Sequence, residues 1–441
     1  MSEHANLEIK KLCLYSFSNY IDKKIASLVF SDINLIVINN FKYGYDEEET
    51  PITYYAYKTK VGNAKDRLDV LGYTMNKLEK LFCDKKELLI DYAPLLSHLH
   101  KNYDDFELLA KERYVKNITF KKWLNSLRKF IAFQKDKGSY LDFEKFSDEL
   151  KINTETDKII FYGLCDFQWD YRYSYGLKLE ENEFPLILRA ILECCDNEED
   201  IILDFTSIQF WDEDCIPKSI GLNDVQEKTI VLLEGTSDKE ILDFSLEHLF
   251  PHLKDLIYFM DFKVKDNKRS GGASFIVSNM KCFYFAKLKQ KFIALFDNDS
   301  EGYKCKNVLL NDIKDWPDNY SIQCYAEIDI LKKYPCISPN NVIELVNITR
   351  KAASIELYLP DRMIKNENDD FYPIEWESRN KINIDNREEF VYQGVITNKE
   401  FIKERFYKTR NNINNSVEEF VEEEWQKMKT LLKSILFAFK D

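Results

Sequence analysis

The sequence predicts an α/β fold, in which a parallel sheet with flanking helices follows a mixed, mainly helical N-terminal region. The main observation is a regular alternation of strand and helix patterns that begins at Lys228. Its strands are short, continuous apolar runs, which are typical of a parallel sheet covered on both faces. A second observation is that acidic residues directly follow two of these runs. Together they predict a Rossmann-like sheet with a ligand site at one edge.

Length and composition narrow the class of protein. With 441 residues, the chain has room for two or three domains. Its 62 Lys and Arg against 76 Asp and Glu give a net charge of -14, which argues against a protein that wraps nucleic acid through overall basic charge. No apolar run is long enough to span a membrane, and the acidic start lacks a signal-peptide core, so we expect a cytoplasmic protein without membrane contact. Ten cysteines without a C-x-x-C pair indicate no zinc site.

The texture of the sequence predicts three segments, with boundaries at 1–222, 226–360 and 361–441. The first segment has β-branched and aromatic runs up to about residue 60, and then apolar residues at three- and four-residue steps, so we expect 63–200 to be mainly helical. A strand is predicted at 201–205 and a linker at 221–224. In the third segment, a capping box at Ser416 predicts an amphipathic helix that ends at Lys440.

The middle segment carries the strand–helix alternation. A capping box formed by Ser237 and Glu240 predicts the first of its helices, and another helix is expected from about Tyr303. Such an alternation indicates parallel strands joined by right-handed crossovers. The predicted strands are 229–233, 256–260, 292–296 and 322–326, and the first two helices are 237–249 and 273–288.

Acidic residues cluster after two of the predicted strands. Glu234 follows the first strand, Asp297 and Asp299 follow the third, and Asp238 lies in the first turn of the next helix. Ligands of open parallel sheets bind at the carboxyl ends of the strands, so we expect these carboxylates to share one edge. Crowded carboxylates repel one another, and Mg²⁺ or Mn²⁺ with oxygen ligands relieves that repulsion. A single acid after a strand is more often a helix cap or a solvated loop residue, but the combination predicts a metal site.

The pattern E-G…D-x-D-x-x-G, which ends at Gly302, resembles the Toprim domain of topoisomerases, primases and the overcoming-lysogenization-defect nucleases. The resemblance implies that Glu234 is the catalytic glutamate and that Asp297 and Asp299 are catalytic acids that bind metal. It also implies that Asp238 is the additional acidic metal ligand of the nuclease branch.

Two later blocks are similar to further blocks of the same proteins. Residues 353–359 resemble a block that supplies another acidic ligand, here Glu356; the alternative is a buried helix with a solvated Glu356. Tyr392-Gln393-Gly394 and the following Lys399 resemble a block whose lysine stabilises charge on the phosphate. The resemblance thus adds Glu356 to the expected metal ligands and Lys399 to the expected catalytic residues.

The N-terminal segment resembles that of HEPN/Toprim-associated proteins, on residues 57–59, 67–73 and 184–204. HEPN ribonucleases use an R-x4-6-H motif, and no histidine of this chain follows an arginine at that spacing. The resemblance therefore implies a dimerising or substrate-sensing module in a homodimer, without a second active site.

By elimination, the expected function is metal-dependent hydrolysis of phosphodiester bonds in DNA or RNA. The chain lacks the zinc sites of primases and recombination mediators and is short for the gate of a topoisomerase. The resembled proteins often act in antiphage defence, which implies a partner protein from a defence system. The alternative is a non-catalytic module that binds metal and nucleic acid or senses a partner.

Basic residues beside the predicted site are the first candidates for contacts with nucleic acid. The loop before Gly272 carries Lys263, Lys265, Lys268 and Arg269. A second basic stretch, 111–137, has interleaved aromatic residues that are suited to stacking on bases. Its alternative interpretation is an amphipathic helix with the aromatic residues in the core.

Overall fold

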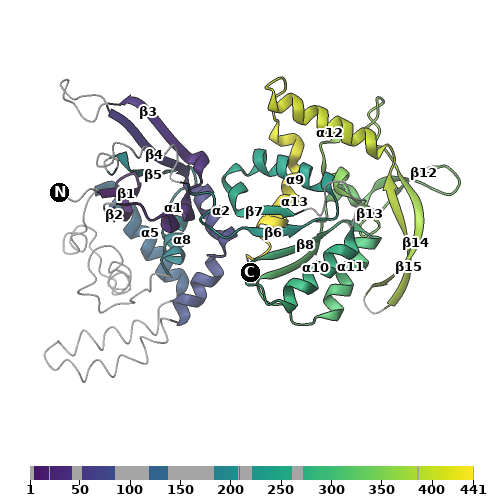
Figure 1. The fold of residues 1–441 in the computed structure, drawn as a ribbon, viewed down its shortest axis with the longest axis horizontal. Coiled ribbons are helices and arrows are strands. Elements are labelled where there is room, and N and C mark those ends of the chain that lie inside the picture. Colours follow the sequence, from purple (N-terminus) through teal and green to yellow (C-terminus); the bar gives the residue numbers. More distant parts are fainter. Residues whose placement is uncertain are drawn as a thin grey trace. The chain divides into compact units, whose positions relative to one another are not determined.

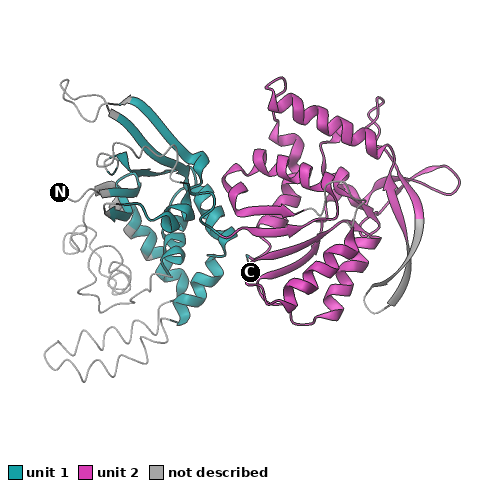
Figure 2. Cartoon of the chain, viewed as in Figure 1, with its two compact units in different colours: residues 1–226, 440–441 teal, residues 227–439 magenta. Residues whose placement is uncertain are grey.

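A computed structural model of the protein describes residues 4–18, 20–41, 52–84, 119–137, 183–206, 208, 221–260, 272–384 and 387–440. The chain divides into two compact units, residues 1–226 with 440–441 and residues 227–439 (Figure 2). Within the described ranges, no helix has the length and apolar character needed to cross a membrane.

The first unit is built on a five-stranded antiparallel sheet with the order β2-β1-β5-β4-β3. Strand β5 (Asp200–Asp204) confirms the strand predicted at 201–205 and pairs with both β1 and β4. The other strands are β1 (His4–Ile9), β2 (Leu12–Ser18), β3 (Leu35–Phe41) and β4 (Ile52–Lys60). Its helices include α1 (Lys23–Val29), α2 (Val61–Leu71), α5 (Phe120–Lys137) and α8 (Phe184–Glu193).

Packing in this unit supports one of the two alternatives for the basic stretch 111–137. Trp123, Leu127 and Ile131 of α5 are buried in the core of the unit. The described part of the basic stretch is therefore an amphipathic helix whose apolar face packs inward. The residues 221–224, predicted as a linker, are attached to the first unit. Leu222 is buried, and its N–H donates to Asp32 Oδ1 at 2.9 Å.

The second unit contains the predicted parallel sheet, with the strand order β10-β8-β6-β7 (Figure 1). Helices α9 (Thr236–Leu249), α10 (Ala273–Phe285) and α11 (Ser300–Asp312) connect its strands. Strands β6 and β8 are neighbours although β7 lies between them in the sequence, so the sheet has its topological switch point there. The strands are β6 (Thr229–Leu232), β7 (Ile257–Met260), β8 (Phe292–Phe296) and β10 (Tyr320–Cys324).

Helices cover both faces of this sheet. Figure 1 shows α10 and α11 together on one side and α9 with α13 (Gln426–Leu436) on the other. Ile276 and Met280 of α10 and Leu309 of α11 pack on the first face. On α9, Phe244 contacts Phe406 of α12 (Lys399–Asn414) and also Trp425. The C-terminal segment therefore completes the core of the second unit.

A second sheet of this unit has the order β12-β11-β14-β15. Its strands are β11 (Tyr334–Ile337), β12 (Ile343–Val346), β14 (Ile374–Ile384) and β15 (Arg387–Ile396). Two very short strands, β9 (Asn298–Asp299) and β13 (Ala352–Ala353), pair antiparallel. This pairing places residues 352–353 directly beside the D-x-D motif.

Two helix starts predicted from capping boxes are wrong. Helix α9 begins at Thr236 with Gly235 as N-cap, because Asp238 Oδ2 accepts the N–H of Gly235 at 3.1 Å. Ser416 starts no helix; it has a φ of 56° and its N–H donates to Ile413 O at the end of α12. Helix α13 begins ten residues later, after a 3-10 turn.

Candidate functional site

Four of the predicted acidic residues lie at the carboxyl edge of the parallel sheet, at its switch point. Glu234 follows β6, and Asp297 follows the neighbouring strand β8. Asp299 lies in β9 and is the N-cap of α11, whereas Asp238 lies in the first turn of α9. We call these four residues the acidic edge.

Glu234 and Asp297, both partly buried, form the centre of the acidic edge. The N–H of Asp297 donates to Glu234 Oε1 at 3.0 Å. Burial raises the pKa of Glu234 to about 8, and Asp299 and Asp238 add to this effect, whereas the hydrogen bond opposes it. Burial and the nearby Glu234 also raise the pKa of Asp297 well above its usual range. Asp297 Oδ1 is buried without a hydrogen-bond partner, which is costly for a carboxylate.

Asp299 and Asp238 are fixed by hydrogen bonds to the backbone of their own helices. Asp299 Oδ1 accepts the N–H of Gly302 at 2.7 Å, and its Oδ2 accepts Gln393 Nε2 at 2.8 Å. Ser300 Oγ donates to Gln393 Oε1 at 3.0 Å. Burial raises the pKa of Asp299, and burial followed by repulsion from Glu356 raises that of Asp238 to about 7. Four acids with raised pKa values therefore share this edge.

Gly302 allows α11 to approach the end of β8. A Cβ at this position would lie 2.2 Å from the carbonyl oxygen of Asp297, closer than any real contact. Because the nearest atom belongs to the backbone, no flexible side chain could move to make room for the Cβ. Glycine is therefore required where the D-x-D motif meets the helix that Asp299 caps.

Glu356 and Lys399 approach the acidic edge from the C-terminal side. Glu356, in a 3-10 helix (Ile355–Tyr358), is fully buried, so the alternative of a solvated side chain is wrong. Its Oε2 accepts Ser354 Oγ at 2.7 Å, and its Oε1 lies 3.2 Å from Lys399 Nζ. Burial lowers the pKa of Lys399, but attraction to Glu356 and Asp297 outweighs it, so the net pKa is raised. The side chain of Lys399 therefore places a positive charge beside the acids.

The donor set of the acidic edge fits a hard divalent cation, because all of its ligating atoms are carboxylate oxygens. Asp297 Oδ1 has no hydrogen-bond partner, and burial together with the neighbouring carboxylates makes ionisation of Glu234 and Asp297 unfavourable, which a bound cation would offset. Within the described part of the chain, however, no three His, Cys, Asp or Glu side chains already converge as an ion site. The residues fit the cation in chemistry, and backbone N–H groups hold three of the carboxylates, those of Glu234, Asp238 and Asp299, at this edge.

The basic residues predicted to contact nucleic acid, Lys263, Lys265, Lys268 and Arg269, lie outside the described residues. Gly272, the first described residue after them, donates its N–H to the carbonyl of Glu234 at 3.2 Å. That contact places Gly272 at the acidic edge.

The sequence did not single out two side chains that organise this edge. Gln393 bonds Asp299, and Asn298, inside the D-x-D motif, donates from Nδ2 to the carbonyl of Tyr325 at 2.9 Å. Gln393 lies in β15, distant in sequence, so only the resemblance of its block pointed to it. For Asn298 the only signal is its place between the two aspartates.

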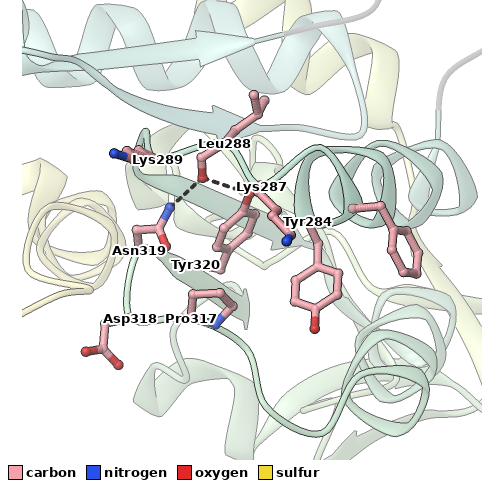
Figure 3. Close-up of a pocket in the computed structure, with 9 residues that line it drawn as sticks. Tyr284, Lys287, Leu288, Lys289, Pro317, Asp318, Asn319 and Tyr320 are labelled. Carbon is pink, nitrogen blue, oxygen red and sulfur yellow. Dashed lines mark hydrogen bonds between the residues drawn. The ribbon is translucent and has the colours of Figure 1, made fainter.

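A cavity of 740 Å³ opens at the opposite edge of the same sheet, where β8 and β10 begin (Figure 3). Tyr284, Lys287, Lys289 and Tyr320 line it together with Phe285, Leu288, Pro317, Asp318 and Asn319. None of the predicted site residues lines this cavity.

Fold and site define an α/β protein with a partly buried acidic cluster at the switch point of a parallel sheet. Residues 1–211 match the family described as HEPN/Toprim N-terminal domain 1. The match supports a HEPN/Toprim-associated protein, as the N-terminal resemblance implied, and this family suggests a nucleic-acid-related, nuclease-like function. No curated protein and no solved structure matches the chain.

Proposed function

We propose that this protein is a metal-dependent nuclease that hydrolyses phosphodiester bonds of DNA or RNA at the acidic edge of a Toprim domain. The observation that carries the proposal is the buried, partnerless Oδ1 of Asp297 among three further acids with raised pKa values. Perturbed titratable groups that gather at a switch point are typical of functional sites.

Glu234, Asp297 and Asp299 would hold the cation, Mg²⁺ or Mn²⁺, with Asp238 and Glu356 as further acidic ligands. A bound divalent cation activates water and neutralises charge on a phosphate. The backbone N–H groups of Asp297 and Gly302 fix the orientation of Glu234 and Asp299 before any ligand binds. Lys399 supplies a side-chain cation for the phosphate, supported by its raised pKa beside Glu356 and Asp297.

An acidic protein needs local cations to hold a polyanion. We assign this role to Lys263, Lys265, Lys268 and Arg269, supported by the contact of the adjoining Gly272 with Glu234. The resemblance to HEPN/Toprim-associated proteins motivates the remaining proposals. These are a homodimer, a cytoplasmic location, and a role in antiphage defence together with a partner protein.

The test is cleavage of plasmid DNA and of RNA in the presence of Mg²⁺ or Mn²⁺. We expect Asp297→Ala to lower the rate by at least about a hundredfold, because it removes a metal ligand. The matched control is Asp318→Ala, which removes an exposed acid at the opposite edge of the sheet and should keep the wild-type rate. Full cleavage by Asp297→Ala would refute the assignment of the metal site.

One observation favours the second candidate, a non-catalytic module that binds metal and nucleic acid. Lys399 Nζ lies 3.2 Å from Glu356 Oε1, so the side-chain cation that catalysis would need for the phosphate already neutralises a buried acid. This candidate predicts that the wild type binds Mn²⁺ in calorimetry, that Asp297→Ala loses this binding, and that neither protein cleaves DNA or RNA. Cleavage by the wild type decides for the nuclease.

A further inference from the structure

Arg350 has a strained backbone directly beside the acidic edge. Its φ is 61°, in the left-handed region that residues with a Cβ other than Asn and Asp seldom adopt. Arg350 lies two residues before β13, which pairs with β9, the strand that contains Asn298 and Asp299. The intervening Lys351 forms a backbone β-bridge with Asp299. Strain of this kind persists only where the surrounding structure imposes it, and it concentrates at functional sites.

The D-x-D motif itself holds Arg350 in this conformation. The N–H of Arg350 donates to Asn298 Oδ1 at 2.8 Å, and Asn298 Nδ2 donates to the carbonyl of Tyr325 at 2.9 Å. Asn298 is buried, with 3% of its surface exposed, so these bonds are shielded from water. The position of Arg350 is thus coupled to the residue between Asp297 and Asp299.

The side chain of Arg350 is oriented on an aromatic ring of α11. Its guanidinium carbon lies 5.0 Å from the ring centroid of Tyr303, in the first turns of the helix that Asp299 caps. Its ion pair with Glu327, at 3.6 Å, is weak because the two side chains are 45% and 54% exposed. A guanidinium held on a ring keeps its donor fork oriented, which suits it to bidentate contact with a phosphate.

We propose that Arg350 binds a backbone phosphate of the nucleic acid beside the acidic edge, with Tyr303 as the residue that positions its guanidinium. This inference rests on the proposed function, because it assigns a substrate contact to the same site. The acidic edge repels a polyanion, so the guanidinium of a residue whose backbone is bonded to the D-x-D motif would direct one phosphate toward the carboxylates. The strained backbone serves binding and not stability.

Arg350→Gly separates these two roles, because glycine adopts the observed φ without strain and removes the cation. We expect its melting temperature to be unchanged or higher. Its affinity for a labelled single-stranded oligonucleotide, as DNA and as RNA, should fall about tenfold in EDTA, and the salt dependence of binding should lose about one phosphate contact. Tyr303→Leu keeps the cation without its platform and should weaken binding less.

The matched control is Lys287→Gly. Lys287 also has a left-handed φ, 54°, and an exposed basic side chain, but it lines the cavity at the opposite edge of the sheet. The Lys287→Gly substitution removes the same charge and relieves the same backbone strain, but far from the acidic edge. We therefore expect oligonucleotide binding by this variant to stay within about twofold of wild type. Equal losses in the two variants, or unchanged binding by Arg350→Gly, would overturn the inference.

The same measurements separate this inference from the proposed nuclease. If the wild type cleaves and Arg350→Gly binds normally, the nuclease proposal stands and the role of Arg350 is refuted. If the wild type binds without cleaving and Arg350→Gly loses this binding, the nuclease proposal is refuted and the phosphate contact stands. A wild type that binds neither DNA nor RNA in EDTA refutes the contact.

Discussion

The two edges of the parallel sheet differ in how their polar groups are satisfied. At the amino edge, side chains around the 740 Å³ cavity are bonded locally: Asn319 Nδ2 donates to the carbonyls of Leu288 and Gln290, and Tyr320 Oη donates to Leu288. The acidic edge contributes no residue to that cavity, but it has a buried carboxylate oxygen without a partner and four acids with raised pKa values. The two edges therefore differ in polar satisfaction as well as in volume, and perturbed titratable groups are the feature typical of functional sites.

The largest expected effect is at Gly302, and it tests whether the acidic edge depends on close backbone contact. Alanine normally stabilises a helix relative to glycine by about 1 kcal/mol. Here its Cβ would meet the carbonyl oxygen of Asp297, so we expect Gly302→Ala to lower the free energy of unfolding by about 3 kcal/mol. Urea denaturation measures this loss, with Val308→Ala, at an exposed position of the same helix, as the control. Equal stability of the two variants would show that α11 can move away from β8.

A smaller effect is expected for Lys399→Met, which compares ion pairs at the two edges. It leaves the fully buried Glu356 without its cation and should cost about 2 kcal/mol, reduced from the cost of a fully buried pair because 34% of the lysine side chain is exposed. Adding Glu356→Gln should restore most of the loss. As the comparison, Lys281→Met breaks the more exposed ion pair with Asp312 and should cost less than about 0.5 kcal/mol. Additive costs for Lys399→Met and Glu356→Gln would exclude their coupling.

A further expected effect is a dependence of stability on pH that belongs to the acidic edge. The folded-state pKa values of Glu234 and Asp238, about 8 and about 7, lie above those of unfolded carboxyls, so the folded protein binds protons more tightly. This contribution is full below about pH 4 and is lost as pH rises through 7 to 8. In EDTA, the melting temperature should therefore fall between these limits.

Two comparisons identify the source of that pH dependence. Glu234→Gln cannot ionise at this position and should flatten the fall, whereas Asp318→Asn at the amino edge should keep the wild-type slope. Mg²⁺ should raise the melting temperature more at pH 8 than at pH 6, because the cation competes with protons for the carboxylates. A slope that Glu234→Gln leaves unchanged would place its origin elsewhere in the chain.

The strands of the parallel sheet were predictable because each is one continuous apolar run that parallel sheets bury on both faces. The runs at 229–233, 256–260 and 292–296 appear as β6, β7 and β8 with ends shifted by at most one residue. Helix α12 was not predicted, because only Ile402, Phe406 and Thr409 of its sixteen residues are buried and the apolar stripe is narrow. The two-residue strands β9 and β13 exist only through their pairing with each other.

For the site, the sequence predicted the acids that directly follow strands but not the groups that orient them. Glu234, Asp297 and Asp299 could be placed at one edge because the carboxyl ends of parallel strands coincide. Gln393 and Arg350 reach that edge through β15 and the β9–β13 pairing, which are contacts between segments far apart in sequence. Neither residue type nor spacing encodes such contacts.

The C-terminal segment after residue 360 has a consequence for how this protein can be divided. It supplies Gln393 to Asp299, Lys399 to Glu356 and Phe406 to Phe244, so the acidic edge and its supporting core extend across the boundary predicted at 360/361. A fragment that ends at 360 would keep every predicted acid and lose the partners that orient two of them. Recombination between relatives at that boundary would exchange part of the site along with the helices, so such chimeras should retain activity only when both segments come from the same parent.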